Sequence, residues 1–292
     1  MVGLALLAWC VAGAIGDEGA REGWRALGRA HPGLIAALLA CTAASAAVNG
    51  LVFFVTGRPL TELRAIDLQR LNLVANLLNY APVRLGLAAR VAWHMTVDRL
   101  SLLQIGGWFA VIGVVLVVGT GAAFGATLLV PSIGGLWVGL FFGQIIAGLL
   151  AFRFAGARLL ARHGRGVERI LQDPAAIWIA GGLRVVDLAV YWARMAIAAT
   201  ILELQLSPSA LLILAIVAFT SSLVPFGRVG FREFAVAAAG GWIGMEAAGV
   251  EASMKQLALL DSAGEVGFYL VAGAVCLPWY RRRWTAALAA SR

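Results

Sequence analysis

The feature that most constrains this fold is a helix-breaking segment, residues 221–233, inside an apolar run that covers residues 211–243. The segment reads Ser-Ser-Leu-Val-Pro-Phe-Gly-Arg-Val-Gly-Phe-Arg-Glu. Pro225 removes a backbone donor and stops the helix that precedes it. Gly227 and Gly230 allow backbone angles that a helix does not use. The sequence therefore predicts an interrupted helix rather than one continuous span.

Composition places this interruption in a membrane. Of the 292 residues, 61% are hydrophobic and 13% are charged, whereas soluble domains carry roughly 25% charged residues. Irregular backbone survives in hydrocarbon only where protein covers it or where it lines a cavity. Broken helices with nearby charges are typical of transporter binding sites. Because no stretch is long and polar enough for a soluble domain, we expect one membrane domain, residues 1–292.

Apolar segments predict an all-α polytopic protein with about six transmembrane helices, since a spanning helix needs roughly 20 apolar residues. The expected spans are residues 2–16 (short), 33–56, 102–122, 133–152, 175–204 and 257–280. Two other segments are interrupted near their middles, around Pro82 and Pro225, and predict two re-entrant helical hairpins. One hairpin falls within residues 33–122 and the other within 175–280, so we expect an inverted repeat of these two parts.

The basic residues predict the orientation, if each hairpin returns to its own side. One side then carries 14 arginines, and the other carries three arginines and one lysine. The 14 are Arg58, Arg64, Arg70, Arg90, Arg99, Arg153, Arg158, Arg162, Arg165, Arg169, Arg281, Arg282, Arg283 and Arg292, and the four are Arg21, Arg25, Arg29 and Lys255. The positive-inside rule places both termini in the cytoplasm, in what we expect to be a bacterial inner (plasma) membrane. If both hairpins crossed the membrane, the basic loop 153–169 would face outside.

Ionisable side chains recur on two helix faces within the expected spans. With spacings of three or four, they are Arg184, Asp187, Tyr191 and Arg194, and then Asp261, Glu265 and Tyr269. Such spacing puts each group on one face. An intramembrane charge costs roughly 2.5–3.5 kcal/mol even on lenient scales, so it faces protein and finds a partner. A static ion-pair network and a substrate site both fit this pattern, and Arg184 could instead reach the cytoplasmic surface.

Arginines also follow both helix-breaking prolines. Arg228, Arg232 and Glu233 fall in the first turn after the second break, and Arg84 holds the matching place after Pro82. Free N–H groups at a helix start favour anions, and the guanidinium fork suits phosphate. We expect two such half-helix starts, approaching the midplane from opposite faces, to bind an anionic headgroup. Arg84 could alternatively anchor its helix at the interface.

Other chemistry lacks a recognisable pattern. The histidines and cysteines are His31, His94, His163, Cys10, Cys41 and Cys276. They show neither metal-ligand spacing nor a disulfide framework. The sequence also has no Ser-His-Asp arrangement, P-loop or dinucleotide fingerprint. We therefore expect no metal, no cofactor and no catalytic set. Helix-flanking arginines explain the net charge of +8 better than nucleic-acid binding does.

Both breaks resemble motifs of the transmembrane, flippase-like region of lysylphosphatidylglycerol synthases and their stand-alone relatives. That family carries a Pro-Gly-Gly-Ile-Gly-x-x-Glu-like motif. Gly227, Gly230 and Glu233 match it, whereas Pro225 stands one place early and Arg228 replaces a glycine. The family's early Asn…Pro…Arg-x-Gly-Glu…Arg motif is similar to Asn79, Pro82, Arg84, Gly86 and Arg90, with Leu87 in place of the glutamate. The resemblance covers residues 33–280.

This resemblance implies a flippase or transporter for an anionic phospholipid or a lipid-linked substrate, and not an enzyme. The aminoacyl-transferase domain of the full synthases is missing, so we do not expect this chain alone to lysylate lipid. One alternative is an intramembrane aminoacyl- or glycosyl-transferase that uses Glu233, Asp261 or Glu265 as its acid or base. Another is a non-catalytic membrane partner of a synthase. The expected partners are membrane lipids, with a second copy of the chain or a separate synthase as further candidates.

Overall fold

A computed structural model describes residues 6–12, 18–81, 85–160, 166–221, 230–242 and 250–290. Five of the residues expected at the two hairpins lie outside these described parts: Pro82, Arg84, Pro225, Gly227 and Arg228. The predictions made for their side chains and backbone therefore stay predictions. Glu233, Gly230, Asn79 and Gly86, which flank them, are described.

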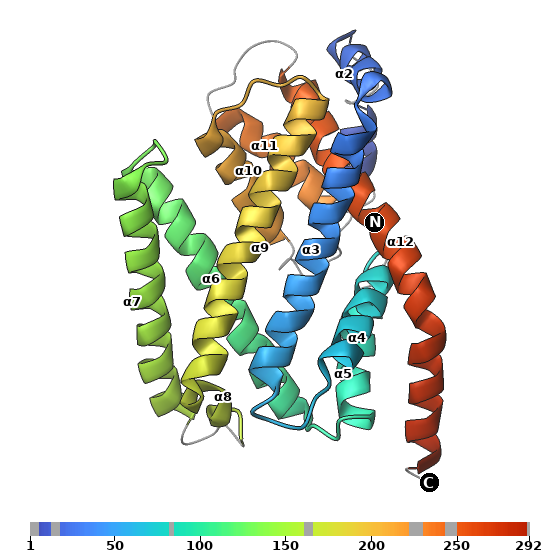
Figure 1. The fold of residues 1–292 in the computed structure, drawn as a ribbon, viewed down its shortest axis with the longest axis vertical. Coiled ribbons are helices and arrows are strands. Elements are labelled where there is room, and N and C mark those ends of the chain that lie inside the picture. The colour runs from blue at the N-terminus through green and yellow to red at the C-terminus, as the bar shows by residue number, and fades with distance from the viewer. Residues whose placement is uncertain are drawn as a thin grey trace. The chain divides into compact units, whose positions relative to one another are not determined.

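Regular structure in the described residues is entirely α-helical, as the sequence predicts (Figure 1). The helices are α2 (Glu18–Arg29), α3 (Pro32–Gly57), α4 (Ala65–Leu78), α5 (Leu85–Thr96), α6 (Leu102–Leu129), α7 (Gly135–Leu160), α8 (Glu168–Gln172), α9 (Pro174–Ile201), α10 (Pro208–Ser221), α11 (Phe231–Trp242) and α12 (Val250–Ala290). Residues 6–12 are helical as well.

Five of these helices are long and apolar enough to cross a membrane. Their spans are Pro32–Gly57 in α3, Leu102–Leu129 in α6, Gly135–Gly156 in α7, Pro174–Ile201 in α9 and Ala252–Ala290 in α12. At 1.5 Å per residue, even 22 residues cover about 33 Å, slightly more than the roughly 30 Å of hydrocarbon. The chain is therefore a multi-pass membrane protein with five candidate spans. The sixth expected span, residues 2–16, is described only over 6–12.

Two pairs of helices are only half as long. Helices α4 and α10 each have 14 residues, and α5 and α11 each have 12, so each measures about 18–21 Å. Helix α4 packs against α5, and α10 packs against α11 (Figure 1). At Gly86 a Cβ atom would lie 1.8 Å from the backbone oxygen of Ala75. Only glycine therefore lets α5 start this close to α4.

Several helix ends differ from the expected boundaries. Helix α12 continues from Val250 to Ala290, past the three arginines that were expected to close it at residue 280. Helix α4 begins at Ala65, inside the charged patch 58–70, and α7 extends to Leu160 in the expected basic loop. Hydropathy marks where a helix leaves the membrane, but backbone hydrogen bonds and the high helix propensity of arginine carry it further.

The chain divides into two compact units, each made of several stretches. Unit 1 comprises Met1–Ser45, Tyr80–Arg84 and Leu188–Phe268, and unit 2 comprises Ala46–Asn79, Leu85–Asp187 and Tyr269–Arg292. Unit 1 therefore contains the short-helix pair α10–α11, and unit 2 contains the pair α4–α5. The expected single domain with an inverted repeat stays a prediction.

Unit 2 is held together by aromatic side chains with polar tips. The Trp108 indole of α6 is buried and donates from Nε1 to Thr56 Oγ1 of α3 over 2.7 Å. It also meets Phe53 edge-on, with ring centroids 5.8 Å apart. Trp137 of α7 likewise donates to Thr127 Oγ1 of α6 over 3.1 Å. A buried indole N–H needs such a partner, so these bonds fix how α3, α6 and α7 pack.

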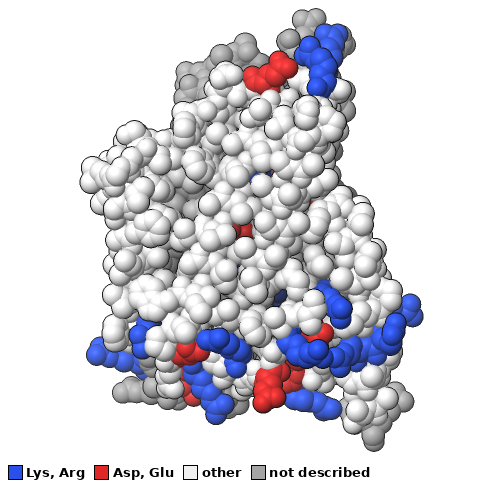
Figure 2. All heavy atoms as spheres, in the orientation of Figure 1, with Lys and Arg blue, Asp and Glu red and all other residues white. Residues whose placement is uncertain are grey.

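Exposed arginines of unit 2 lie in loops, near helix ends and in the last quarter of α12. In unit 2 the exposed arginines include Arg58, Arg99, Arg158, Arg281 and Arg282. Figure 2 shows most of the visible surface free of charge, with basic and acidic atoms gathered in bands. Uncharged flanks bounded by arginine-rich ends are the pattern expected of helices in a bilayer. Arg90 and Lys255, which the charge count places at the two sides of the membrane, are instead buried, each about 7% exposed.

Candidate functional site

Unit 1 contains four fully buried charges, here named the ion-pair cluster: Arg194, Arg232, Asp261 and Glu265. Arg194 comes from α9, Arg232 from the first turn of α11, and the two carboxylates from successive turns of α12. None of the four side chains is more than 3% exposed. The cluster therefore links three helices through buried charges.

Each guanidinium in this cluster meets both carboxylates. Arg194 Nη2 lies 2.7 Å from Asp261 Oδ1 and 3.4 Å from Glu265 Oε2. Arg232 forms ion pairs with the same two carboxylates. Two positive and two negative charges balance, which is what makes burial of all four tolerable. These contacts form a static ion-pair network of the kind that the spacing of the charges allowed.

Tyrosines surround the ion-pair cluster. The Tyr80 hydroxyl donates to Glu265 Oε1 over 3.3 Å. The Tyr191 ring lies beside both guanidiniums, 4.9 Å from Arg194 and 5.9 Å from Arg232. Aromatic faces stabilise cations at such distances. One aromatic ring thus contacts both guanidiniums, and a hydroxyl donates to one of the two carboxylates.

Glu233 is adjacent to Arg232 in sequence, but its carboxylate binds the backbone at the start of α11. Its Oε2 accepts a 2.6 Å hydrogen bond from the backbone N–H of Gly230. Gly230 has a φ of 89°, which an L side chain rarely adopts. The pair closes the first turn of α11 as a capping carboxylate does. This local bond explains why glycine and glutamate stand three residues apart at this position.

Unit 2 contains a second buried polar group, here named the amide cluster. Its members are Asn49 of α3, Asn72 and Asn76 of α4, Arg90 of α5, and Arg184 and Asp187 of α9. Arg184 Nη1 lies 3.0 Å from Asp187 Oδ2 on its own helix and 3.3 Å from Asn49 Oδ1. Asp187 therefore pairs with an arginine of its own helix.

Asn72 is the centre of the amide cluster. It is fully buried, and its Oδ1 accepts from Arg90 at 2.8 Å, from Asn49 at 3.0 Å and from Asn76 at 3.1 Å. Its Nδ2 donates to the Ala46 backbone oxygen over 2.9 Å. An amide oxygen has two lone pairs. Three N–H donors therefore share one amide oxygen that has only two lone pairs.

Arg90 is the most unusual member of the amide cluster. It is 7% exposed, and its guanidinium lies over the Phe53 ring, 3.9 Å from the centroid. Within the described parts of the chain its only hydrogen-bond acceptor is the neutral Asn72 amide, and no carboxylate pairs with it. A guanidinium has five N–H donors. Arg90 is therefore a buried cation with capacity for an anionic oxygen.

The group expected on one face of residues 184–194 is divided between the two clusters. Arg184 and Asp187 belong to the amide cluster, whereas Tyr191 and Arg194 adjoin or form the ion-pair cluster. Tyr269, expected with the α12 carboxylates, is buried as well. Arg184 is also buried rather than extended to the surface, at 5% exposure. Long helices of 28 residues can supply polar groups at more than one depth.

Sequence reasoning missed Asn49, Asn72 and Asn76, and it counted Arg90 among the arginines at the cytoplasmic side. The spacing of Asn72, Asn76 and Asn79 by four and three residues was a usable signal, because amides on one face of an apolar helix must find partners. Asn79 ends α4, and its Oδ1 is buried with no hydrogen bond to any described residue. Counting only charges overlooked these neutral amides.

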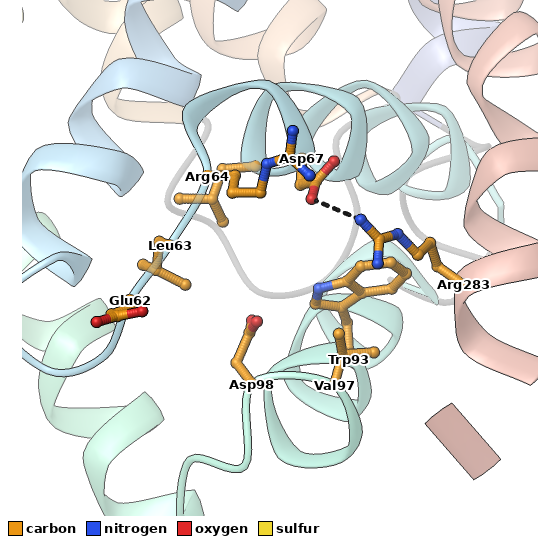
Figure 3. Close-up of a pocket in the computed structure, with 9 residues that line it drawn as sticks. Glu62, Leu63, Arg64, Asp67, Trp93, Val97, Asp98 and Arg283 are labelled. Carbon is orange, nitrogen blue, oxygen red and sulfur yellow. Dashed lines mark hydrogen bonds and ion pairs between the residues drawn. The ribbon is translucent and has the colours of Figure 1, made fainter. Parts of the chain in front are cut away.

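At the C-terminal end of α5, a cavity of about 180 Å³ opens within unit 2 (Figure 3). Asp67 and Arg283 bridge its rim at 3.4 Å, and the Trp93 ring and the Asp98 carboxylate face it. Asp98 Oδ2 also lies 2.6 Å from Nδ1 of the buried His94. Across the described residues, no three His, Cys, Asp or Glu side chains group as metal ligands.

Comparison with protein-family models, with curated proteins and with solved structures gives no match for this chain. The two buried clusters and the short-helix pairs beside them are therefore the basis for any functional conclusion.

Proposed function

We propose that this protein is a transporter or flippase for an anionic phospholipid or a lipid-linked anion. The observation that carries the proposal is Arg90, a buried guanidinium whose acceptor is a neutral amide. An intramembrane ionisable residue is by default a candidate functional residue. The phosphate of a lipid headgroup supplies the anionic oxygens that Arg90 lacks, in the geometry that a guanidinium fork recognises.

The short helices give this site a route into the membrane. We infer that α4–α5 and α10–α11 are re-entrant hairpins, because each helix is about half the length that a span requires. Within unit 2, the Asp67–Arg283 pair joins the start of α4 to the end of α12, and the Arg58–Asp173 pair joins the end of α3 to the start of α9. These contacts support an α4–α5 hairpin in which the start of α4 lies on the same side as the other arginine-rich helix ends.

The same basic ends support the orientation. Removing the buried Arg90 and Lys255 from the charge count leaves 13 basic residues against three. The positive-inside rule then still favours cytoplasmic termini, in the plasma membrane of a bacterium. Cysteine substitution at Gly166 and Gln205, in a chain without its native cysteines, tests this in intact cells. Reagent that cannot cross the membrane should label position 205 and not position 166, and the reverse would overturn the orientation.

The proposal agrees with the resemblance to the flippase-like region of lysylphosphatidylglycerol synthases, in which Arg90 matches the last arginine of the early motif. Arg84 and Arg228 stay predicted headgroup contacts. The transferase alternative needs a carboxylate free for proton transfer, yet Asp261 and Glu265 each pair with two arginines.

Transport is tested in sealed proteoliposomes that contain fluorescent phosphatidylglycerol or phosphatidylcholine, with chemical bleaching of the outer leaflet. The wild type should move phosphatidylglycerol faster. Arg90→Gln should lower apparent affinity roughly tenfold to a hundredfold, since a hydrogen bond to a charged group contributes about 1.5–3 kcal/mol. Arg90→Lys should recover part of the loss.

Arg99→Gln is the matched control, because Arg99 is exposed and lies in the loop that follows α5. It should transport like the wild type. If folded Arg90→Gln protein also transports like the wild type, the amide cluster is structural and the proposal fails. Lipid modification in detergent with a soluble donor, without transport, would favour the transferase alternative.

A further inference from the structure

The C-terminal half of α12 forms one wall of a second cavity in unit 2, of about 500 Å³, here named the arginine pocket. Its lining includes Arg70, Arg282, Arg283, Val275, Cys276 and Trp279. It shares no residue with the amide cluster, and no acidic side chain lines it. Three guanidiniums therefore converge on one hollow without a carboxylate inside it.

The three arginines differ in what holds them. The Arg70 guanidinium lies over the Trp279 ring, 5.5 Å from its centroid, and Arg283 forms the 3.4 Å pair with Asp67. Arg282 is exposed and forms no ion pair with any residue that the structure describes. Arg70 and Arg283 are thus held by contacts within unit 2, and Arg282 is available to bind an anion. This is a prepared site for a single anionic group rather than a set of unrelated surface charges.

The face of α12 next to the arginines is apolar and uncovered. Val275 is 75% exposed, and Val271, one turn earlier, is 69% exposed. From Val271 to Arg282 the helix rises about 16 Å, so one face changes from apolar to cationic over the length of part of an acyl chain. Trp279 lies 5.0 Å from Trp93, between centroids, and such aromatic groups mark the interface between hydrocarbon and headgroups.

We propose that the arginine pocket binds one anionic phospholipid as a resident of the protein. Its phosphate contacts Arg70, Arg282 and Arg283, and its acyl chains lie along Val271 and Val275. Charge complementarity selects an anionic headgroup, and the exposed valines select a molecule with an apolar tail over free phosphate. The site goes beyond the proposed transport function and does not depend on it, because retention of a lipid is measured without transport.

Intact mass spectrometry of the purified, delipidated protein in detergent tests this, with dioleoyl phosphatidylglycerol or dioleoyl phosphatidylcholine added back. The wild type should retain one phosphatidylglycerol at low excess, whereas phosphatidylcholine should not be retained. Arg282→Gln and Arg70→Gln should each weaken phosphatidylglycerol retention about tenfold. Arg281→Gln is the matched control, because Arg281 is exposed and adjacent in sequence but does not line the pocket.

Three results would overturn the proposal. Equal losses for Arg281→Gln and Arg282→Gln would mean that only general positive charge attracts the lipid. Unchanged retention in the Arg70→Gln/Arg282→Gln double variant would mean that the lipid binds elsewhere. Displacement of the lipid by millimolar inorganic phosphate would mean that the tail contributes nothing. Arg282 and Arg281 are both exposed, so neither substitution should prevent folding.

Discussion

The ion-pair cluster of unit 1 and the amide cluster of unit 2 bury the same number of arginines but neutralise them differently. In unit 1, Arg194 and Arg232 share two carboxylates, and the charges balance. In unit 2, Arg184 has Asp187, whereas Arg90 has an amide oxygen and an aromatic ring. Among the described residues, one region therefore pairs both of its arginines with carboxylates, whereas the other pairs one arginine, Arg90, with an amide and a ring instead.

This difference teaches how to separate structural charges from candidate binding charges in a membrane. A buried charge is tolerated because its partner offsets the loss of hydration. Removing one member of an ion pair therefore leaves the other charge buried without that compensation. A buried arginine with a neutral partner already bears that cost in the native state. Its persistence needs another benefit, and we infer that benefit to be ligand binding. The following predictions compare the two clusters by the free energy of unfolding in detergent micelles.

The largest effect is expected for Asp261→Asn in the ion-pair cluster. The substitution leaves Arg194 and Arg232 with a single carboxylate, and breaking a buried pair costs about 3–5 kcal/mol. Thermal or denaturant unfolding should show this loss. The double variant with Arg232→Gln should recover part of it, because the surplus cation is then removed. Strict additivity of the two single losses would contradict the shared ion pairing.

A smaller effect is expected for Arg90→Met in the amide cluster. The substitution removes a hydrogen bond to a neutral acceptor and a cation–π contact, each worth about 0.5–2 kcal/mol, and it also removes a buried charge. We therefore expect stability within about 2 kcal/mol of the wild type, together with loss of phosphatidylglycerol transport. A loss as large as that of Asp261→Asn would show that Arg90 has a structural counter-charge and would remove the contrast between the clusters.

The sequence allows much of the fold to be predicted because membrane spans leave a strong signal. About 20 apolar residues must cross the hydrocarbon. The expected spans 33–56 and 102–122 lie within α3 and α6, and the expected span 175–204 coincides with α9 up to Ile201. The sequence did not allow the end of α12 to be predicted, because a helix can continue into water without a hydropathy pattern that marks its last residue. The boundaries between the two units could not be predicted from the sequence either, since they depend on contacts between segments that are distant in sequence.

The candidate site was only partly predictable. The spacing of Asp261 and Glu265 indicated a shared face that needs cationic partners, and the ion pairs follow from it. Arg90 was counted among the arginines at the cytoplasmic side, because hydropathy cannot distinguish an arginine buried in a short helix from one at a membrane surface. Asn72 carries no charge, so a search for intramembrane charges passed over the residue that organises the amide cluster.

Asn72→Asp should convert the amide cluster into a copy of the ion-pair arrangement. The new carboxylate would pair with Arg90, while Asn49 and Asn76 can still donate to it. The lost bond to the Ala46 oxygen is offset, because Gln69 also donates to that oxygen at 3.1 Å. We expect stability within about 1 kcal/mol of the wild type, because a charge-assisted hydrogen bond replaces a neutral one.

The functional effect of Asn72→Asp should nevertheless be large, because Arg90 is then neutralised and anionic lipid transport should fall as in Arg90→Gln. Asn72→Gln keeps the amide and serves as its control for charge. Full transport by a stable Asn72→Asp protein would mean that Arg90 does not receive the headgroup.

The smallest effects are expected for ion pairs at the surface, of which each unit offers one. Arg29 and Glu203 of unit 1 lie 3.7 Å apart with side chains 67% and 68% exposed. Arg58 and Asp173 of unit 2 lie 3.5 Å apart and are 41% and 29% exposed. Water and salt screen such charges, so Arg29→Gln and Arg58→Gln should each change stability by only about 0.2–1 kcal/mol. Unfolding at low and high salt would check this, since the small loss should shrink further as salt rises. If either change cost as much as Asp261→Asn, burial would not be what separates the ion-pair cluster from ordinary ion pairs, and the contrast between the two clusters would need another cause.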